Sequence, residues 1–214
     1  MMFTIIFPVL NERLRLESGV TRTVEYLQSI AFEDYEIIIV DNGSEDETPQ
    51  IAEKLCKKYD KVKYERINVR GVGAAFRRGV EVSHGDVVGY MDIDLSTNIR
   101  HLGEAIHLFE TQPEVQYING SRFARESDTK GRKMVPQDHV AGTVDSVKAV
   151  LTDEIHGCHL RLHICPQRDG TLADRGCSRD NGWFYMIEFL LRAEKRGVKI
   201  LIIRWSGRKI IILR

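Results

Sequence analysis

Short β-rich apolar runs alternate four times with stretches of helical spacing over the first 111 residues of this 214-residue chain. Within each helical stretch, apolar residues recur three or four positions apart. Parallel strands need a crossover of about this length, whereas antiparallel neighbours can be joined by a tight turn. The alternation therefore predicts an α/β fold, with a mostly parallel central sheet flanked by helices. The expected strands are residues 3–9, 35–40, 62–66 and 87–91, and the expected helices residues 18–30, 44–59, 71–83 and 99–110.

Polar side chains follow each of the four expected strands. The carboxyl ends of parallel strands meet at one edge of a sheet, and in open α/β sheets ligands bind at that edge. We therefore expect this edge to hold a nucleotide. The polar residues are Asn11 with Glu12, Asp41, residues 66–71, and Asp92 with Asp94.

The fourth expected strand ends in Asp92-Ile93-Asp94. If the backbone is still extended there, both carboxylates share one face and Ile93 points into the core. Two hard oxygen ligands suit a divalent cation, Mg²⁺ or Mn²⁺, that also holds a diphosphate. An isolated Asp-x-Asp is more often a surface turn, but the buried strand before it makes a metal site considerably more plausible than for an isolated pair.

Asp41 ends the second expected strand and precedes a helix. At the carboxyl edge a carboxylate can accept hydrogen bonds from a base or a ribose. It can equally help to cap the helix, and position alone does not separate the two roles. Ser44 and Glu47 fit a capping box for that helix, which is expected to run through Tyr59.

Gly71 and Gly73 open the third expected helix, followed by two alanines. Small residues let a ligand approach the backbone, and a helix N-terminus favours phosphate. Phe76 stands where the third glycine of a dinucleotide motif would be, so the match to that motif is incomplete.

The charge balance disfavours nucleic acid as a partner, because 31 basic residues equal 31 acidic ones. No apolar run reaches the length of a membrane span, and the N-terminal run lacks the basic flank of a signal peptide. The four cysteines include no C-x-x-C pair, and reduced thiols are expected. With no linker-like composition, residues 1–214 are predicted to form a single domain in a soluble or peripheral cytoplasmic protein.

Three segments of the second half leave alternatives open. Residues 122–133 hold five basic and two acidic residues, which fits a loop that binds an anion or one that is simply solvated. Residues 156–165 contain His and Cys, but their alternation with apolar residues favours a half-buried strand over a zinc site. Basic residues predominate from Arg192 to the C-terminus. They are explained slightly better by a favourable interaction with the dipole of the preceding helix than by binding to an anionic membrane surface.

The order of these motifs resembles glycosyltransferase family 2, and most closely its dolichyl-phosphate mannosyltransferase and polyprenyl-phosphate glucosyltransferase group. The resemblance runs from about Phe3 to Trp205. It is carried by Pro8 with Asn11-Glu12, residues 40–44 with Asp46 and Thr48, residues 71–75, Asp92-Ile93-Asp94-Leu95, Gly120-Ser121-Arg122, Asp153 and residues 188–197.

This resemblance implies a GT-A fold, a nucleotide-sugar donor such as GDP-mannose or UDP-glucose, a divalent metal, and inverting transfer of a hexose to a polyprenyl or dolichyl phosphate. Residues 1–111 would form the nucleotide-binding half and residues 112–214 the acceptor-binding half. The implied donor-binding residues are Pro8, Asn11, Glu12, Asp41, Gly71, Gly73 and Asp92, the metal ligands Asp92 and Asp94, the catalytic residues Asp94, Arg122 and Asp153, and the acceptor-phosphate residues Arg122 and Arg132.

Other functions stay open. A phosphate acceptor is already largely dianionic at neutral pH and needs no strong base, whereas a saccharide hydroxyl acceptor would need one, and Asp153 is the candidate. A nucleotide-sugar-binding protein without catalysis is a further alternative. A sugar nucleotidyltransferase is disfavoured, because residues 10–13 contain no glycine.

Overall fold

The structure is a computed structural model that describes residues 1–95, 98–121, 165–166, 177–198, 200–204 and 210–213. Its main sheet has the strand order β3-β2-β1-β4-β6. The first four strands are parallel, and β6 pairs antiparallel with β4. The predicted parallel sheet is therefore confirmed. The strands are β1 (Phe3–Val9), β2 (Tyr35–Asp41), β3 (Val62–Arg66), β4 (Val87–Tyr90) and β6 (Cys165–Pro166).

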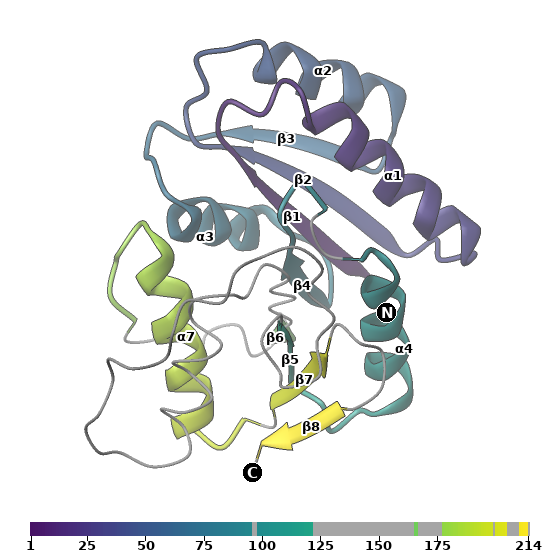
Figure 1. The fold of residues 1–214 in the computed structure, drawn as a ribbon, viewed down its shortest axis with the longest axis vertical. Helices are drawn as coiled ribbons and strands as arrows, with labels where there is room; N and C mark the ends of the chain where they lie inside the picture. The colour runs from purple at the N-terminus through teal and green to yellow at the C-terminus, as the bar shows by residue number, and fades with distance from the viewer. Residues whose placement is uncertain (96–97, 122–164, 167–176, 199, 205–209, 214) are drawn as a thin grey trace, which may run out of the picture.

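Helices cover both faces of this sheet (Figure 1). Side chains of α1, α2 and α4 share one apolar cluster with alternate residues of β1, such as Ile5 and Phe7. Side chains of α3 and α7 form a second cluster with the intervening residue Ile6. Burial on both faces explains why these strands read as continuous apolar runs. The helices are α1 (Leu16–Ser29), α2 (Thr48–Lys58), α3 (Val72–Val82), α4 (Arg100–Thr111) and α7 (Trp183–Lys195).

A smaller sheet is formed by β5 (Tyr117–Ser121), β7 (Ile200–Arg204) and β8 (Ile210–Leu213). β7 pairs parallel with β5 and antiparallel with β8. Gly197, at φ 73°, follows α7 in the left-handed conformation expected of a residue that ends a helix. Over the parts of the chain that the structure describes, no helix has the length and apolar character needed to cross a bilayer.

The strand order creates a switch point between β1 and β4. From β1 the chain proceeds outward to β2 and β3, and it then returns to place β4 on the other side of β1. Connections that leave in opposite directions open a crevice at the carboxyl ends of the two strands, where ligands bind in such sheets. The loops after β1 and β4 leave from these two strand ends, and Asp41 at the end of β2 lies beside Val9.

Candidate functional site

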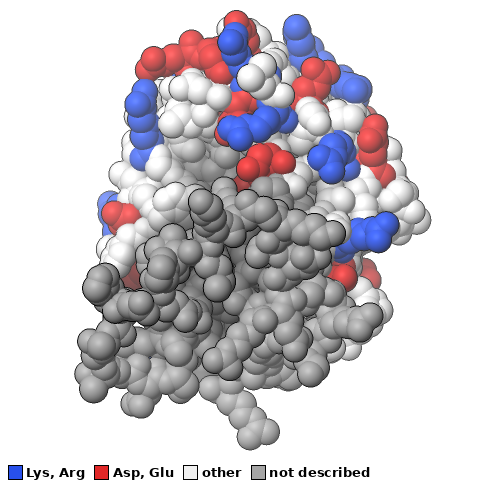
Figure 2. Space-filling view, viewed as in Figure 1, with Lys and Arg blue, Asp and Glu red and all other residues white. Residues whose placement is uncertain are grey.

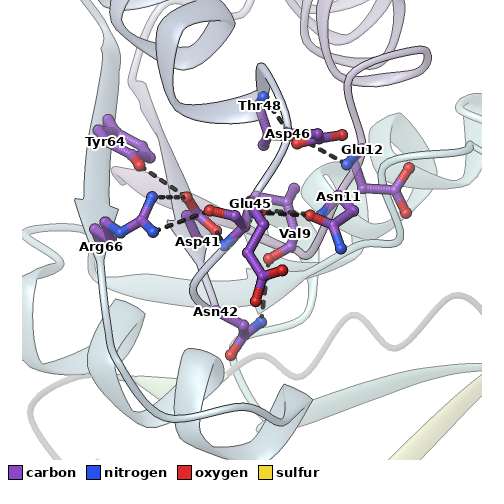
Figure 3. Close-up of polar contacts among 11 residues, drawn as sticks. Val9, Asn11, Glu12, Asp41, Asn42, Glu45, Asp46, Thr48, Tyr64 and Arg66 are labelled. Atoms are coloured by element: carbon purple, nitrogen blue, oxygen red, sulfur yellow. Dashed lines mark hydrogen bonds and ion pairs between the residues drawn. The ribbon is translucent and has the colours of Figure 1, made fainter.

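The loop after β1 is tied to the loop after β2 by hydrogen bonds (Figure 3). Three successive backbone N–H groups, those of residues 11–13, donate to side chains of the second loop, and one backbone N–H of the second loop donates back. The bonds are Asn11 N to Ser44 Oγ (2.8 Å), Glu12 N to Thr48 Oγ1 (2.8 Å), Arg13 N to Asp46 Oδ2 (3.3 Å) and Glu45 N to Asn11 Oδ1 (2.9 Å). Asn11 takes the left-handed conformation, with φ 55°.

Ser44, Asp46 and Thr48 are therefore supporting residues for the β1 loop, a role that sequence reasoning missed. The signal was present, since acceptor side chains stand at alternate positions of this segment. The predicted capping box is wrong: α2 begins at Thr48, and Ser44 Oγ accepts from Asn11 N. The pKa of Asp46 is lowered, because hydrogen bonds from Thr48 and from the Arg13 N–H outweigh the opposing effect of burial.

Asp41 is fully buried, and its carboxylate accepts three hydrogen bonds from the protein. Oδ1 accepts from Ser44 N at 2.7 Å, and Oδ2 accepts from Tyr64 Oη at 2.8 Å and from Arg66 Nη1 at 3.2 Å. Burial, followed by the bond to Asp41, raises the pKa of Tyr64 to about 12. Asp41 thus holds the loop at Ser44 and does not cap α2 directly. A contact with base or ribose stays a prediction.

Arg66 is the exposed member of this cluster, with 43% of its side chain accessible. Its Nη2 donates to the Ser44 carbonyl oxygen at 2.9 Å, so the guanidinium joins β3 to both Asp41 and the loop. A buried carboxylate needs such a partner, because an unpaired charge inside a protein is strongly destabilising.

Glu12 is held at the start of α1. Its carbonyl oxygen accepts from the N–H groups of Arg15 and Leu16, both at 2.9 Å. Its carboxylate, 18% exposed, forms a two-pronged ion pair with Arg15 at 2.7 and 2.9 Å. Pro8 lies beyond Ile6, the last β1 residue paired with β4, so its missing N–H breaks no hydrogen bond to that strand.

The Asp92–Asp94 segment is a turn and not a continuation of the strand. β4 ends at Tyr90, and Leu95 N donates to the Asp92 carbonyl oxygen at 3.1 Å. Leu95 is left-handed, with φ 46°. Both carboxylates were expected on one face of an extended strand, but the backbone at Asp92 to Asp94 is not extended. Ile93 is nevertheless buried, while Asp92 is partly exposed and Asp94 is exposed.

The N-terminus of α3, predicted to face phosphate, meets another part of the chain. The Asn181 carbonyl oxygen accepts from Gly73 N at 2.8 Å and from Ala74 N at 3.2 Å. A Cβ on Gly71, which has φ 130°, would overlap the Asn181 carbonyl group. The close approach that these glycines permit is thus made in this structure by the segment before α7.

Arg77 secures the same contact from α3. Its Nη1 donates to the Asp180 carbonyl oxygen at 2.7 Å and its Nη2 to Asn181 Oδ1 at 2.6 Å. The guanidinium also stacks over the ring of Tyr185, 4.7 Å from its centroid. Sequence reasoning missed Arg77, because its partners are more than a hundred positions away.

Several predicted residues lie outside the described part of the chain. They are Arg122, the basic segment through Arg132, Asp153 and residues 156–164. Within the described ranges, no group of three His, Cys, Asp or Glu side chains is arranged to hold a metal ion. Positive and negative side chains are interspersed over the coloured surface in Figure 2, as expected for a chain with balanced charge.

The Glycosyl transferase family 2 model matches residues 4–163. Glycosyltransferase AglD of Haloferax volcanii is 32% identical over 202 residues, covering 92% of this chain and 31% of that protein. The dolichyl-phosphate beta-glucosyltransferase of Mus musculus is 33% identical over 137 residues (59% and 42%), and the dolichol-phosphate mannosyltransferase of Pyrococcus furiosus is 31% identical over 144 residues (63% and 40%). The chain spans between 31% and 42% of the length of these relatives.

Solved structures share the fold. Glucosyl-3-phosphoglycerate synthase from Mycobacterium tuberculosis, in complex with UDP, matches with a TM-score of 0.63 at 18% identity, covering 95% of this chain and 70% of that one. The S. aureus TarS 1-349 structure with UDP matches with a TM-score of 0.58 at 20% identity (98% and 59%). At these identities the likeness establishes the architecture alone.

Proposed function

Because the chain belongs to glycosyltransferase family 2, we propose that it moves a hexose, mannose or glucose, from a nucleotide-diphosphate sugar to a polyprenyl or dolichyl phosphate. The observation that carries this proposal is the switch point in the strand order between β1 and β4, because the Asn11–Glu12 loop follows β1 and the Asp92–Asp94 turn follows β4. The names of two relatives, a dolichyl-phosphate glucosyltransferase and a dolichol-phosphate mannosyltransferase, support the choice of acceptor and sugars.

A divalent cation, Mg²⁺ or Mn²⁺, fits the donor set at the β4 turn. Asp92 and Asp94 supply hard carboxylate oxygens, and such cations bind through one or two carboxylates together with phosphate oxygens and water. The small number of protein ligands therefore suits a metal that is completed by the substrate. When bound, the cation would neutralise the charge that develops on the departing diphosphate. One neighbour was solved with Mn²⁺ and UDP, and this supports the choice of metal.

The donor would lie along the carboxyl edge, with its diphosphate at β4 and its nucleoside toward β1 and β2. Neighbouring strands are about 4.8 Å apart, so a ligand that runs along the edge reaches the loops of several strands. Pro8, Asn11 and Glu12 would contact the nucleoside. Asp41 would act mainly by holding the loop, and Gly71 and Gly73 would act by shaping the wall of the site at α3.

The transfer is a single displacement at the anomeric carbon, which inverts its configuration. An acceptor phosphate oxygen forms the new bond to this carbon as the bond to the diphosphate breaks, and the nucleoside diphosphate leaves with the electron pair. A phosphate monoester with a second pKa near 6 is largely dianionic at neutral pH, so no strong general base is needed. Arg122 and Arg132 would position the acceptor phosphate, with residues 1–111 binding the donor and residues 112–214 the acceptor.

Donor turnover tests the proposal. The protein is incubated with Mn²⁺ or Mg²⁺ and with GDP-mannose or UDP-glucose, with and without a polyprenyl phosphate, and release of nucleoside diphosphate is followed. We expect release that depends on the acceptor and is lost in Asp94→Asn. Asp60→Asn, an exposed carboxylate after α2, is the matched control and should retain turnover. Metal-dependent donor binding without turnover by either donor would overturn the acceptor assignment.

Two alternatives have their own outcomes. Release that requires a saccharide and not a polyprenyl phosphate would identify a hydroxyl acceptor, with Asp153 as the base. Binding without turnover under any acceptor would identify a non-catalytic nucleotide-sugar-binding protein. Because a polyprenyl phosphate resides in a bilayer, the proposal also entails peripheral contact with a membrane, which co-sedimentation with vesicles that contain the lipid would measure.

A further inference from the structure

Helix α1 touches the Asp92–Asp94 turn at a glycine. Gly19 lies in the interior of α1, and a Cβ built on it would overlap the Ile93 carbonyl oxygen and lie 2.7 Å from Ile93 Cδ1. Ile93 is 3% exposed and belongs to the same apolar cluster as the buried residues of α1. Ile93 thus packs directly on the backbone of α1 at Gly19, through both its carbonyl oxygen and its side chain.

Backbone hydrogen bonds attach the chain to the sheet just before the turn. Met91 N donates to the Ile6 carbonyl oxygen at 3.0 Å, and the next backbone bond, Leu95 N to Asp92 O, is internal to the turn. β4 itself ends at Tyr90, before the carboxylates. The contact with Gly19 therefore lies beyond the end of the β ladder.

The same helix also holds the β1 loop. The Glu12 carbonyl oxygen accepts from Arg15 N, and Gly19 N donates to the Arg15 carbonyl oxygen at 2.8 Å. One helical turn, about 6 Å of rise, separates these two attachments. These backbone hydrogen bonds run from Glu12 through Arg15 to Gly19, so α1 links the loop at Glu12 to the turn at Ile93.

We infer that Gly19 is a positioning residue, which seats the Asp92–Asp94 turn on α1 and thereby keeps the metal-binding end of the donor site in register with its nucleoside end. This inference rests on the proposed function. Its consequence is coupling: metal and nucleotide should strengthen each other's binding only while the contact between Gly19 and Ile93 is intact. If Gly19 merely allowed close packing, a substitution would lower stability and leave the coupling unchanged.

Gly19→Ala tests the inference, with Gly103→Ala as the matched control. Gly103 is also inside a helix, α4, but its Cβ would overlap only the hydroxyl of Tyr26, the far end of a side chain that can rotate. Mn²⁺ affinity is measured by electron paramagnetic resonance with and without GDP or UDP, nucleotide affinity by calorimetry with and without Mn²⁺, and folding by circular dichroism. Gly19→Ala should lose about 10-fold or more of the mutual enhancement, because a shift of about 1 Å in a site can cost about 100-fold.

Nucleotide affinity without metal should stay near the wild-type value in both variants, because the β1 and β2 loops are tied to each other independently of the turn. Full mutual enhancement in a folded Gly19→Ala protein would overturn the inference. A wild-type protein that binds neither nucleotide, with or without Mn²⁺, would overturn the donor proposal and this inference together. The two failures are therefore distinguishable.

A second pair of variants covers the case in which Gly19→Ala does not fold. Ile93→Val and Ile106→Val each shorten one buried isoleucine of the same cluster, but only Ile93 contacts Gly19. Ile93→Val should weaken the mutual enhancement several-fold, while Ile106→Val should leave it intact. Equal enhancement in these two variants would overturn the inference.

Discussion

Tyr64→Phe separates the supporting role of Asp41 from a role in ligand contact. The substitution removes only the hydroxyl group that donates to Asp41 Oδ2 at 2.8 Å. Asp41 is fully buried, so water does not replace the lost donor. The carboxylate keeps Ser44 N at 2.7 Å and Arg66 Nη1 at 3.2 Å, and the β2 loop should therefore hold its path at lower stability.

The size of the effect follows from these contacts. A hydrogen bond to a charged group contributes about 1.5–3 kcal/mol. Because Arg66 still compensates the charge, we expect a loss near the lower value. For a chain of this length, about 1.5 kcal/mol corresponds to a fall of roughly 3–6 °C in Tm.

Thermal and urea unfolding measure this loss, and Tyr26→Phe is the matched control. The Tyr26 hydroxyl donates to the Arg100 carbonyl oxygen at 3.3 Å in an exposed position, so its removal should change stability by no more than about 0.5 kcal/mol. Nucleotide affinity is measured in parallel and should change little in either variant.

The pH dependence gives an independent check. The pKa of Tyr64 is raised from 10.0 to about 12, mainly by burial and then by the bond to Asp41. Because the pKa is raised in the folded state, the protonated Tyr64 hydroxyl contributes fully to folding stability below about pH 10. This contribution is lost as the pH rises toward 12. Tyr64→Phe should remove this part of the alkaline loss of stability.

One combination of results would exclude the supporting role of Asp41. If Tyr64→Phe and Tyr26→Phe unfold alike, and Tyr64→Phe alone weakens nucleotide binding, the Tyr64–Asp41 pair contacts the ligand and does not support the loop.

Thr48→Val leaves Glu12 N without its acceptor, which should cost about 1–3 kcal/mol in urea unfolding; a cost below about 0.5 kcal/mol would contradict the support assigned to the β2 loop. Arg77→Met removes the donor to Asn181 Oδ1 and should increase amide hydrogen exchange at the start of α3, with a smaller increase in Arg77→Lys. Unchanged exchange in Arg77→Met would show that Arg77 does not hold the segment before α7 against α3. Hydrogen bonds from Ser178 lower the pKa of Glu188 to about 2. The ionised Glu188 should therefore contribute fully to folding stability above about pH 4.5, and this contribution should be lost as the pH falls toward 2. Acid titration of stability measures this loss, which should be absent in Glu188→Gln.

The parallel sheet could be predicted because its signal is local. Ile37 to Val40 is apolar at every position, and only a strand covered on both faces buries all four side chains. The order of strands β3-β2-β1-β4 is not local, yet polar residues after each strand already indicated that their ends share one edge. This edge is where the candidate site lies.

The geometry of the site could not be predicted in the same way. An Asp-x-Asp pattern permits both a strand and a turn, and the choice here depends on Leu95 and on the contact of Ile93 with Gly19 in another element. Likewise, a glycine-rich helix start permits either a phosphate or a peptide carbonyl group as its neighbour. The neighbour is Asn181, whose proximity to Gly73 arises only after the second half of the chain has folded onto α3.

The contact between α3 and the segment before α7 limits how the chain can be divided. Helix α7 supplies Tyr185, Met186 and Phe189 to the apolar cluster that covers Ile6 and Ile38, and its preceding segment caps α3. A fragment that ends at residue 111 would expose that face of the sheet, so the proposed donor half, residues 1–111, is not expected to fold independently. A chimera that takes its second half from a relative, in order to change the acceptor, would therefore also need matching residues at positions 71, 73 and 77 of α3. These positions and α7 form one interface and would have to be exchanged together.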